Sequence, residues 1–314
     1  MDDLYWHLVD FFQAFAAGLL VGGIYGLMCV GLGIIFGVMR VVNFAQGDFM
    51  MLGMYIAYYL VTGFGTLAFL GPYVGPVVGA LLAGPIVFAI GWLLHKYLIA
   101  RVTGARAVSA EAEGHYTQII LTLGIALILA NGGLILFGSK PLSVQTPLSR
   151  ESWELFGIVF LNQARTVGFV IAVLCALGLY VFLSRARLGK AIRAAADNPI
   201  AAAYVGVDVD RSHRLAFGIG VGITAVAGGL IAMSQSFQPY IGFDFVIVMY
   251  AGVVLGGMGS ILGAFWGGLT IGLVQQMSPL ILPYQLQNTA IFVVFLLIIF
   301  FRPQGMFGRV WERT

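Results

Sequence analysis

The sequence predicts an all-α membrane protein, a polytopic bundle of about eight to ten transmembrane helices. Of its 314 residues, 60% are hydrophobic and only 9% are charged, and the mean hydropathy is +0.98. Ordinary soluble domains carry roughly 25% charged residues. The apolar residues also fall in long runs, many near the roughly 20 residues that a helix needs to cross a bilayer. The net charge of +3 is too small to indicate a nucleic-acid partner.

Apolar segments follow one another along the whole chain, and each is expected to form a helix. They cover about 12–38, 45–62, 72–95, 117–137, 166–183, 215–236, 245–258, 261–282 and 286–301. The seventh is short and runs into Gly256-Gly257-Met258-Gly259, so it is expected to be a broken or re-entrant helix or a short span. Neither end carries a soluble domain, and residues 1–314 are expected to form one transmembrane domain.

Lys and Arg are concentrated in loops on one side of the predicted bundle, which indicates its orientation. The segment 185–214 is rich in them and is placed in the cytoplasm. Counting crossings outward from it leaves only three of the 16 basic residues outside: Lys140, Arg150 and Arg165. The N-terminus is then outside, the C-terminus is inside, and a bacterial cytoplasmic (inner) membrane is the expected location. The acidic N-terminus lacks the basic region of a signal peptide, so no cleavage is expected.

Two loops are long enough to carry structure of their own. The extracytoplasmic loop 138–165 has a mixed composition and is expected to form a small ordered cap. In the cytoplasmic loop 185–214, an Ala-rich helix is expected to stop at Asp197-Asn198, before Pro199. A second short helix should follow and end at Gly206, which suits a C′ cap. This helical hairpin is either a surface for a partner or a plain connection.

A polar stretch, Asn43-Phe44-Ala45-Gln46-Gly47-Asp48, opens the second apolar segment. Polar side chains at membrane depth are costly and are often functional. One interpretation puts them on a solute path or gate. The other makes Asn43 an N-cap, Gln46 its capping-box partner and Asp48 a first-turn partner of the helix dipole. Both stay open, and the candidate path or gate residues are Asn43, Gln46, Asp48, Gln118 and Asn131. On the fourth segment, Gln118, Thr122 and Asn131 either line a path or form interhelical hydrogen bonds, and the latter is favoured slightly.

Further polar residues lie near membrane ends or within apolar segments. Gln235, Gln238 and Asp244 flank a predicted outer turn, and Gln275 and Gln276 lie in the eighth segment. Taken singly, none of them identifies a solute.

Glycines recur at four-residue spacing, which places small residues on one face of a helix. Gly259, Gly263 and Gly267 are one such set. Small faces let helices approach closely where lipid supplies no hydrophobic drive. We therefore expect this set to pack against a neighbouring helix.

The motifs of enzymes and nucleotide-binding proteins do not occur in the sequence. It has no GxxxxGK[ST] sequence, so this chain is not expected to bind ATP. Its four histidines do not pair at metal-ligand spacing, so no metal site is expected. An integral-membrane enzyme would need a convergent set of catalytic side chains, a channel would show a filter motif, and an ion-coupled carrier would need a buried relay. An ion-coupled carrier and a channel stay open as alternatives on these grounds, and an integral-membrane enzyme ranks last.

Several stretches resemble LivH-type permeases, the membrane subunits of branched-chain amino acid ABC importers. Two of them, at 193–206 and 252–264, are the most specific. All the matching stretches are 31–48, 51–53, 193–206, 252–264 and 301–308. In this family His is common where Gln46 stands and Glu is common where Asp48 stands, and both changes keep the polarity of the turn.

The resemblance implies a type II importer architecture and a set of partners. These are a second related permease, two cytoplasmic ATPase subunits that bind ATP and Mg²⁺, an extracytoplasmic solute-binding protein, and membrane lipid. This chain itself would bind no cofactor. The resemblance also implies that the hairpin is the ATPase-coupling loop, with Arg193, Ala194, Ala195, Asp197, Asn198, Pro199, Ala202 and Gly206 as its residues.

The function implied is import of branched-chain or other small amino acids across the cytoplasmic membrane. The alternatives are import of urea, short amides or aromatic acids by the same machinery, or ion-coupled secondary transport. Selectivity in such systems resides largely outside the permease, so the sequence leaves the solute open.

Overall fold

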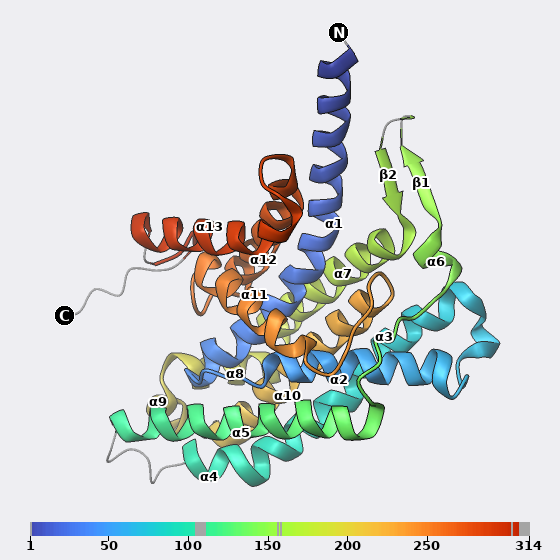
Figure 1. The fold of residues 1–314 in the computed structure, drawn as a ribbon. Coiled ribbons are helices and arrows are strands. Elements are labelled where there is room, and N and C mark those ends of the chain that lie inside the picture. The colour runs from blue at the N-terminus through green and yellow to red at the C-terminus, as the bar shows by residue number, and fades with distance from the viewer. Residues whose placement is uncertain (1, 104–110, 156, 158, 303, 308–314) are drawn as a thin grey trace.

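The predicted helix bundle is confirmed, and all the expected apolar segments are helices in the described part of the chain (Figure 1). The computed structural model describes residues 2–103, 111–155, 157, 159–302 and 304–307. Arg106, Arg309 and Arg313, which were counted as cytoplasmic, lie outside the described residues. The long helices are α1 (Asp2–Met39), α2 (Gln46–Tyr58), α3 (Gly71–Leu94), α5 (Glu111–Phe137), α7 (Gln163–Arg185), α10 (Val209–Ala232), α11 (Ile241–Gly256), α12 (Ile261–Met277) and α13 (Gln287–Phe301).

Six helical stretches within the described residues are long and apolar enough to cross a membrane by themselves. Helices α2, α11 and α12 are shorter. Helix α11 has 16 residues, roughly 24 Å at 1.5 Å per residue, against a hydrocarbon core of about 30 Å. It is continuous from Ile241 to Gly256, so the interruption expected near 256–259 lies after the helix. There Gly257 and Gly259 have φ of 100° and 93°, and Ser260 caps α12 by accepting the Gly263 N–H at 3.0 Å.

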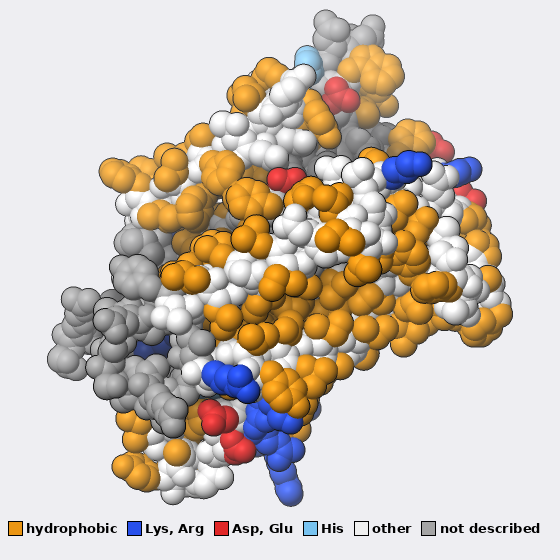
Figure 2. Space-filling model, turned by 60° about the horizontal axis from the view of Figure 1, so that its bottom comes forward, with side chains coloured by type: hydrophobic (Ala, Val, Ile, Leu, Met, Phe, Trp, Pro, Cys, Tyr) orange, Lys and Arg blue, Asp and Glu red, His pale blue; other side chains and the backbone are white. Residues whose placement is uncertain are grey.

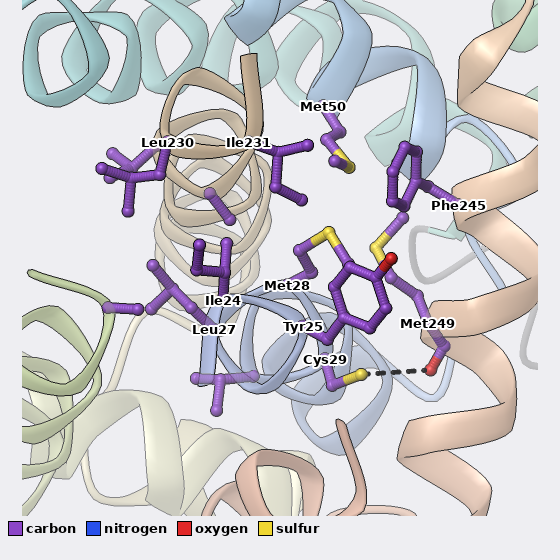
Figure 3. Packing of buried hydrophobic residues seen from close by; sticks show 14 of the residues in the cluster. Ile24, Tyr25, Leu27, Met28, Cys29, Met50, Leu230, Ile231, Phe245 and Met249 are labelled. Atoms are coloured by element: carbon purple, nitrogen blue, oxygen red, sulfur yellow. Dashed lines mark hydrogen bonds between the residues drawn. The ribbon is translucent and has the colours of Figure 1, made fainter. Parts of the chain in front are cut away.

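Helices α1 and α10 form the centre of the bundle. In each, 83% of the most apolar window is buried inside the protein, against 22% for α5 and α7. Helix α1 packs against α12, α10, α7 and α11, and α10 packs against α3 and α2. Side chains of α1 such as Ile24 and Met28 meet α10 and α11 in the core (Figure 3). On the face seen in Figure 2, hydrophobic side chains cover a broad middle area, and Lys and Arg lie toward opposite ends.

The segment 138–165 forms a small structured unit at one end of the bundle. It contains α6 (Pro147–Arg150) and an antiparallel hairpin of β1 (Ser152–Leu155) and β2 (Val159–Asn162), paired from Ser152–Asn162 to Leu155–Val159. Gln13 of α1 binds both backbone groups of Phe160 at 2.8 Å. A bridge from Leu142 to Phe237 joins the segment to the α10–α11 connection. The β-hairpin was not expected from the sequence, because its strands are only four residues long.

The segment 185–214 lies at the opposite end of the bundle. Helix α7 begins just after β2 and ends just before α8 (Arg187–Asp197), so its 23 residues separate the two units (Figure 1). Helix α9 (Pro199–Tyr204) follows at once. The described part of the C-terminal tail folds back under α11, where the Met306 N–H donates to the Leu255 carbonyl at 2.8 Å.

Candidate functional site

Two of the predicted path residues, Asn43 and Gln46, belong to a fully buried polar network. The Gln46 Nε2 donates to the Thr224 hydroxyl at 2.6 Å and to the Gly220 carbonyl at 3.3 Å. The Asn43 Nδ2 donates to the Gln46 Oε1 at 2.8 Å. Thr224 in turn donates to Gly220 at 3.0 Å. The network therefore ties the start of α2 to the middle of α10.

The same network supports a stretch of chain that is not helical. Helix α1 ends at Met39, Arg40 has φ of 52°, and α2 begins only at Gln46. Buried backbone groups need partners. The Ala45 N–H donates to the Asn43 Oδ1 at 3.2 Å, and the Thr122 hydroxyl of α5 lies 3.3 Å from the Val42 carbonyl. The N-cap of α2 is Ala45, so the expectation that Asn43 caps it is wrong. Asn43 acts two residues earlier, on the connecting turn.

Asp48 lies in the first turn of α2 and is 7% exposed. The start of α11 covers it, since a Cβ on Gly242 would stand 2.9 Å from the Asp48 Oδ1. Gly47 is in backbone contact with Gly242. Asp48 thus sits where α2 and α11 cross most closely.

The other two candidates, both on α5, do not join this group as one site. Asn131 is exposed, and its Nδ2 donates to the Leu127 carbonyl of its own helix at 2.8 Å. Gln118 is half-buried. The contact of α5 with the connecting turn is made instead by Thr122, which is 1% exposed.

The cytoplasmic hairpin has the boundaries that its sequence indicates. Helix α8 stops at Asp197, and Asn198 caps α9 by accepting the Ala201 N–H at 3.0 Å. Gly206 has φ of 85°, and its N–H donates to the Ala203 carbonyl at 3.0 Å. The next residue, Val207, donates to the Ala202 carbonyl at 2.9 Å. These two bonds form a Schellman motif, which fixes the end of α9.

The hairpin has a buried face and an exposed face. Some of the predicted coupling residues lie on the buried face and the others on the exposed face. Ala195 is fully buried because α8 packs on α7 and α10, and Ala202 is nearly so because α9 packs on α8 and α10. These two side chains are unavailable to a partner, which corrects the expectation that the small residues themselves form the contact surface. Ala194 is half-buried, and the remaining predicted residues are exposed: Arg193, Asp197, Asn198, Pro199 and Gly206.

The exposed face of the hairpin also carries large apolar side chains that sequence reasoning missed. Ile200, Tyr204 and Val205 are 68%, 88% and 78% exposed. They lie beyond the apolar spans, in the same segment as Arg193. The available signal was the three bulky residues in an Ala-rich loop.

The predicted glycine face on α12 contains two of its three members. Gly263 and Gly267 are in backbone contact with Gly256 and Gly252 of α11. Gly259 lies before the helix, where a Cβ would meet open space but φ is 93°. Gly259 is therefore not on the α12 face; it lies in the turn, and its backbone packs against Gly37 of α1.

A cavity of about 230 Å³ lies between α1, α11, α12 and α13, at the end of the bundle that carries the β-hairpin. Gln235, which follows α10, Asp244 and Gln275 contribute polar groups to its lining. Asn288 of α13 adds an amide, and the Gln275 Nε2 lies 3.4 Å from its Oδ1. Tyr25 completes the polar part, with its ring packed edge-on against Phe245 at 5.9 Å (Figure 3). Several of these residues stand out in the sequence, but only the fold brings them together.

The family is shown by comparison with known proteins. The family model described as branched-chain amino acid transport system / permease component matches residues 14–301. The chain belongs to this family, so it is a multi-pass membrane permease and not an enzyme.

Several curated relatives cover nearly the whole chain. It is 30% identical to the high-affinity branched-chain amino acid transport system permease protein BraD of Pseudomonas aeruginosa, over 98% of both chains. It is 29% identical to LivH of Escherichia coli K12, over 95% of this chain and 96% of LivH. It is also 26% identical to LivM of Salmonella typhimurium, over 90% of this chain and 67% of LivM. No solved structure matches the chain.

Proposed function

We propose that this chain is the transmembrane permease of an ABC importer that carries branched-chain or other small amino acids across a bacterial inner membrane. The observation that carries the proposal is its full-length similarity to BraD and LivH, which are named as high-affinity branched-chain amino acid permeases. Import would depend on ATP and Mg²⁺ held by separate subunits.

The proposed assembly contains a second permease, two ATPase subunits and an extracytoplasmic solute-binding protein. Similarity to both LivH and LivM supports a pair of related permeases. The orientation in this proposal is N-terminus out and C-terminus in. The basic loop 185–214 supports it, because basic residues are retained on the cytoplasmic side.

The hairpin α8–α9 is the proposed contact with an ATPase subunit. Ile200, Tyr204 and Val205 form an apolar tip that no described part of the chain covers. An apolar tip beyond the membrane is typical of a protein contact. Because α8 packs on α7 and α10, a displacement of this tip would be transmitted to α10 at the centre of the bundle.

Co-purification of the assembled complex tests this contact. Tyr204→Glu combined with Ile200→Glu should abolish recovery of the ATPase with the tagged permease, because both replace exposed apolar contact area with charge. Leu155→Glu, an equally simple change on exposed β1 at the other end, should leave recovery unchanged. Full recovery of the ATPase with the double variant would show that the hairpin is not the contact with the ATPase subunit.

Uptake into proteoliposomes tests the transport proposal. With the complex reconstituted, radiolabelled leucine should accumulate only when ATP is supplied on the ATPase side. Uptake of leucine by the permease alone, driven by an ion gradient, would show a secondary carrier instead. ATP-dependent uptake of urea or an aromatic acid in place of leucine would assign the chain to another branch of the same machinery.

A further inference from the structure

Polar side chains from four helices meet at the cavity between α1, α11, α12 and α13; Tyr25 is buried, Gln275 is half-buried, and Asp244 and Asn288 are exposed. The burial of Tyr25 and Gln275 in an apolar bundle is costly unless their polar groups are paired. The four side chains converge from separate elements: Tyr25 from α1, Asp244 from α11, Gln275 from α12 and Asn288 from α13. Elsewhere in this chain, closely packed helices meet at glycines. The polar side chains that converge here therefore point to a ligand.

One buried acceptor in the cavity has no partner within the described protein. The Oε1 of Gln275 accepts no hydrogen bond there, although the Gln275 side chain interacts with the Tyr25 hydroxyl. A buried polar atom left unpaired costs free energy, so such an atom suggests a missing partner. The amide of Gln275 donates toward the Oδ1 of Asn288, and the Nδ2 of Asn288 is the donor group of the same side chain.

The charge of the cavity favours a cationic group. Asp244 is an exposed carboxylate at the lining, and the lining that the structure describes contains no Lys or Arg. A carboxylate and an amide oxygen together suit an ammonium group, which has only donors to offer. The amide donors of Gln235 and Asn288 suit a carboxylate.

The remaining wall of the cavity is apolar. Phe245 and Val248 come from α11, and Ile291 and Phe292 come from α13. The volume of about 230 Å³ lies below the roughly 300–1,000 Å³ that is usual for drug-sized ligands, and so suits a small solute. A small molecule with an ammonium, a carboxylate and a branched apolar side chain matches all three parts of the lining.

We propose that this cavity is the permease's own binding site for an apolar α-amino acid, with Asp244 and Gln275 binding the ammonium group and Gln235 and Asn288 binding the carboxylate. The proposal rests on the proposed function and adds a site and residue roles to it. In the proposed orientation the cavity opens at the outer end of the bundle, where a solute-binding protein would release its cargo.

Equilibrium binding of radiolabelled leucine to the full chain in lipid nanodiscs tests the site without any binding protein. The wild-type chain should bind leucine saturably. Asp244→Asn and Gln275→Leu should each weaken binding by about tenfold to a hundredfold, the usual loss for a hydrogen bond to a charged group. Asp10→Asn, an exposed carboxylate far from the cavity, and Gln276→Leu, the neighbour of Gln275, should bind as the wild type does.

4-Methylpentanoate has the shape of leucine but no ammonium group. It should not displace radiolabelled leucine from the wild-type chain. Absence of saturable leucine binding, or equal binding by wild type and both cavity variants, would overturn the proposal. So would wild-type leucine uptake by an assembled transporter that carries Asp244→Asn and Gln275→Leu. In that last case ATP-driven uptake would persist. The proposed importer function would then be supported, and the proposed binding site would be wrong.

Discussion

At the scale of single residues, Gln46 decides how the chain turns from α1 into α2. Its amide reaches across to Thr224 and Gly220, and its Oε1 accepts from Asn43. All of these groups are buried, so each depends on the others for its partner. This geometry explains the polar residues at 43–46 as support for a buried turn. A path interpretation requires, in addition, that a solute contact them.

Gln46→Leu separates the two interpretations. It keeps most of the side-chain volume but leaves the Asn43 amide without its acceptor, so we expect the free energy of unfolding to fall by about 1–2 kcal/mol. Asn131→Leu, at an exposed position with only a local bond, should change it by less than about 0.5 kcal/mol. Thermal unfolding in detergent measures both. An unchanged stability together with a changed leucine KM would favour the path interpretation.

At the scale of elements, close approach of backbones holds α11, α12 and α1 together. Gly267 is in backbone contact with Gly252 across the α11–α12 pair, and Gly268 meets Gly26 of α1 at 2.6 Å from where a Cβ would be. Lipid competes with apolar side chains as a partner, so tight contact and weak polar bonds are what favour association. The short α11 gains its stability in this way.

Gly267→Ala and Gly178→Ala should therefore change stability in opposite directions. A Cβ at Gly267 would overlap the Gly252 carbonyl, so we expect a loss of about 1–3 kcal/mol. Gly178, in the middle of α7, meets nothing within 4 Å, and alanine there should stabilise the helix by about 0.5–1 kcal/mol. The midpoint of thermal unfolding reports both signs. Stabilisation by Gly267→Ala would contradict the packing account.

At the scale of the whole molecule, the bundle has two chemically different ends. One carries the β-hairpin, the α10–α11 connection and the cavity, and the other carries the α8–α9 hairpin with its basic residues. If the basic end faces the cytoplasm, solute arrives at the end with the cavity, and the ATPase subunits act on the end with the α8–α9 hairpin. Central helices α1 and α10 connect them.

Cysteine labelling tests this orientation. In a Cys29→Ala and Cys175→Ala background, Trp153→Cys should react with an impermeant maleimide in intact spheroplasts, because β1 would face outward. Tyr204→Cys should react only after the membrane is opened. Both positions are exposed in the structure, at 49% and 88%. The reverse labelling pattern would invert the proposed topology.

The sequence by itself determined which segments are helical and where α8 and α9 end, because run length, glycine turns and caps are local properties. Helix α8 stops before Pro199 and α9 ends at Gly206 for reasons visible within ten residues. Only the tertiary structure decided which faces are buried. Along a helix that is apolar all round, hydrophobic periodicity does not distinguish lipid from protein, since both are apolar. Ala195 is therefore buried, Tyr204 is exposed, and Gln275, Asp244 and Tyr25 meet at one cavity for reasons that no single segment contains.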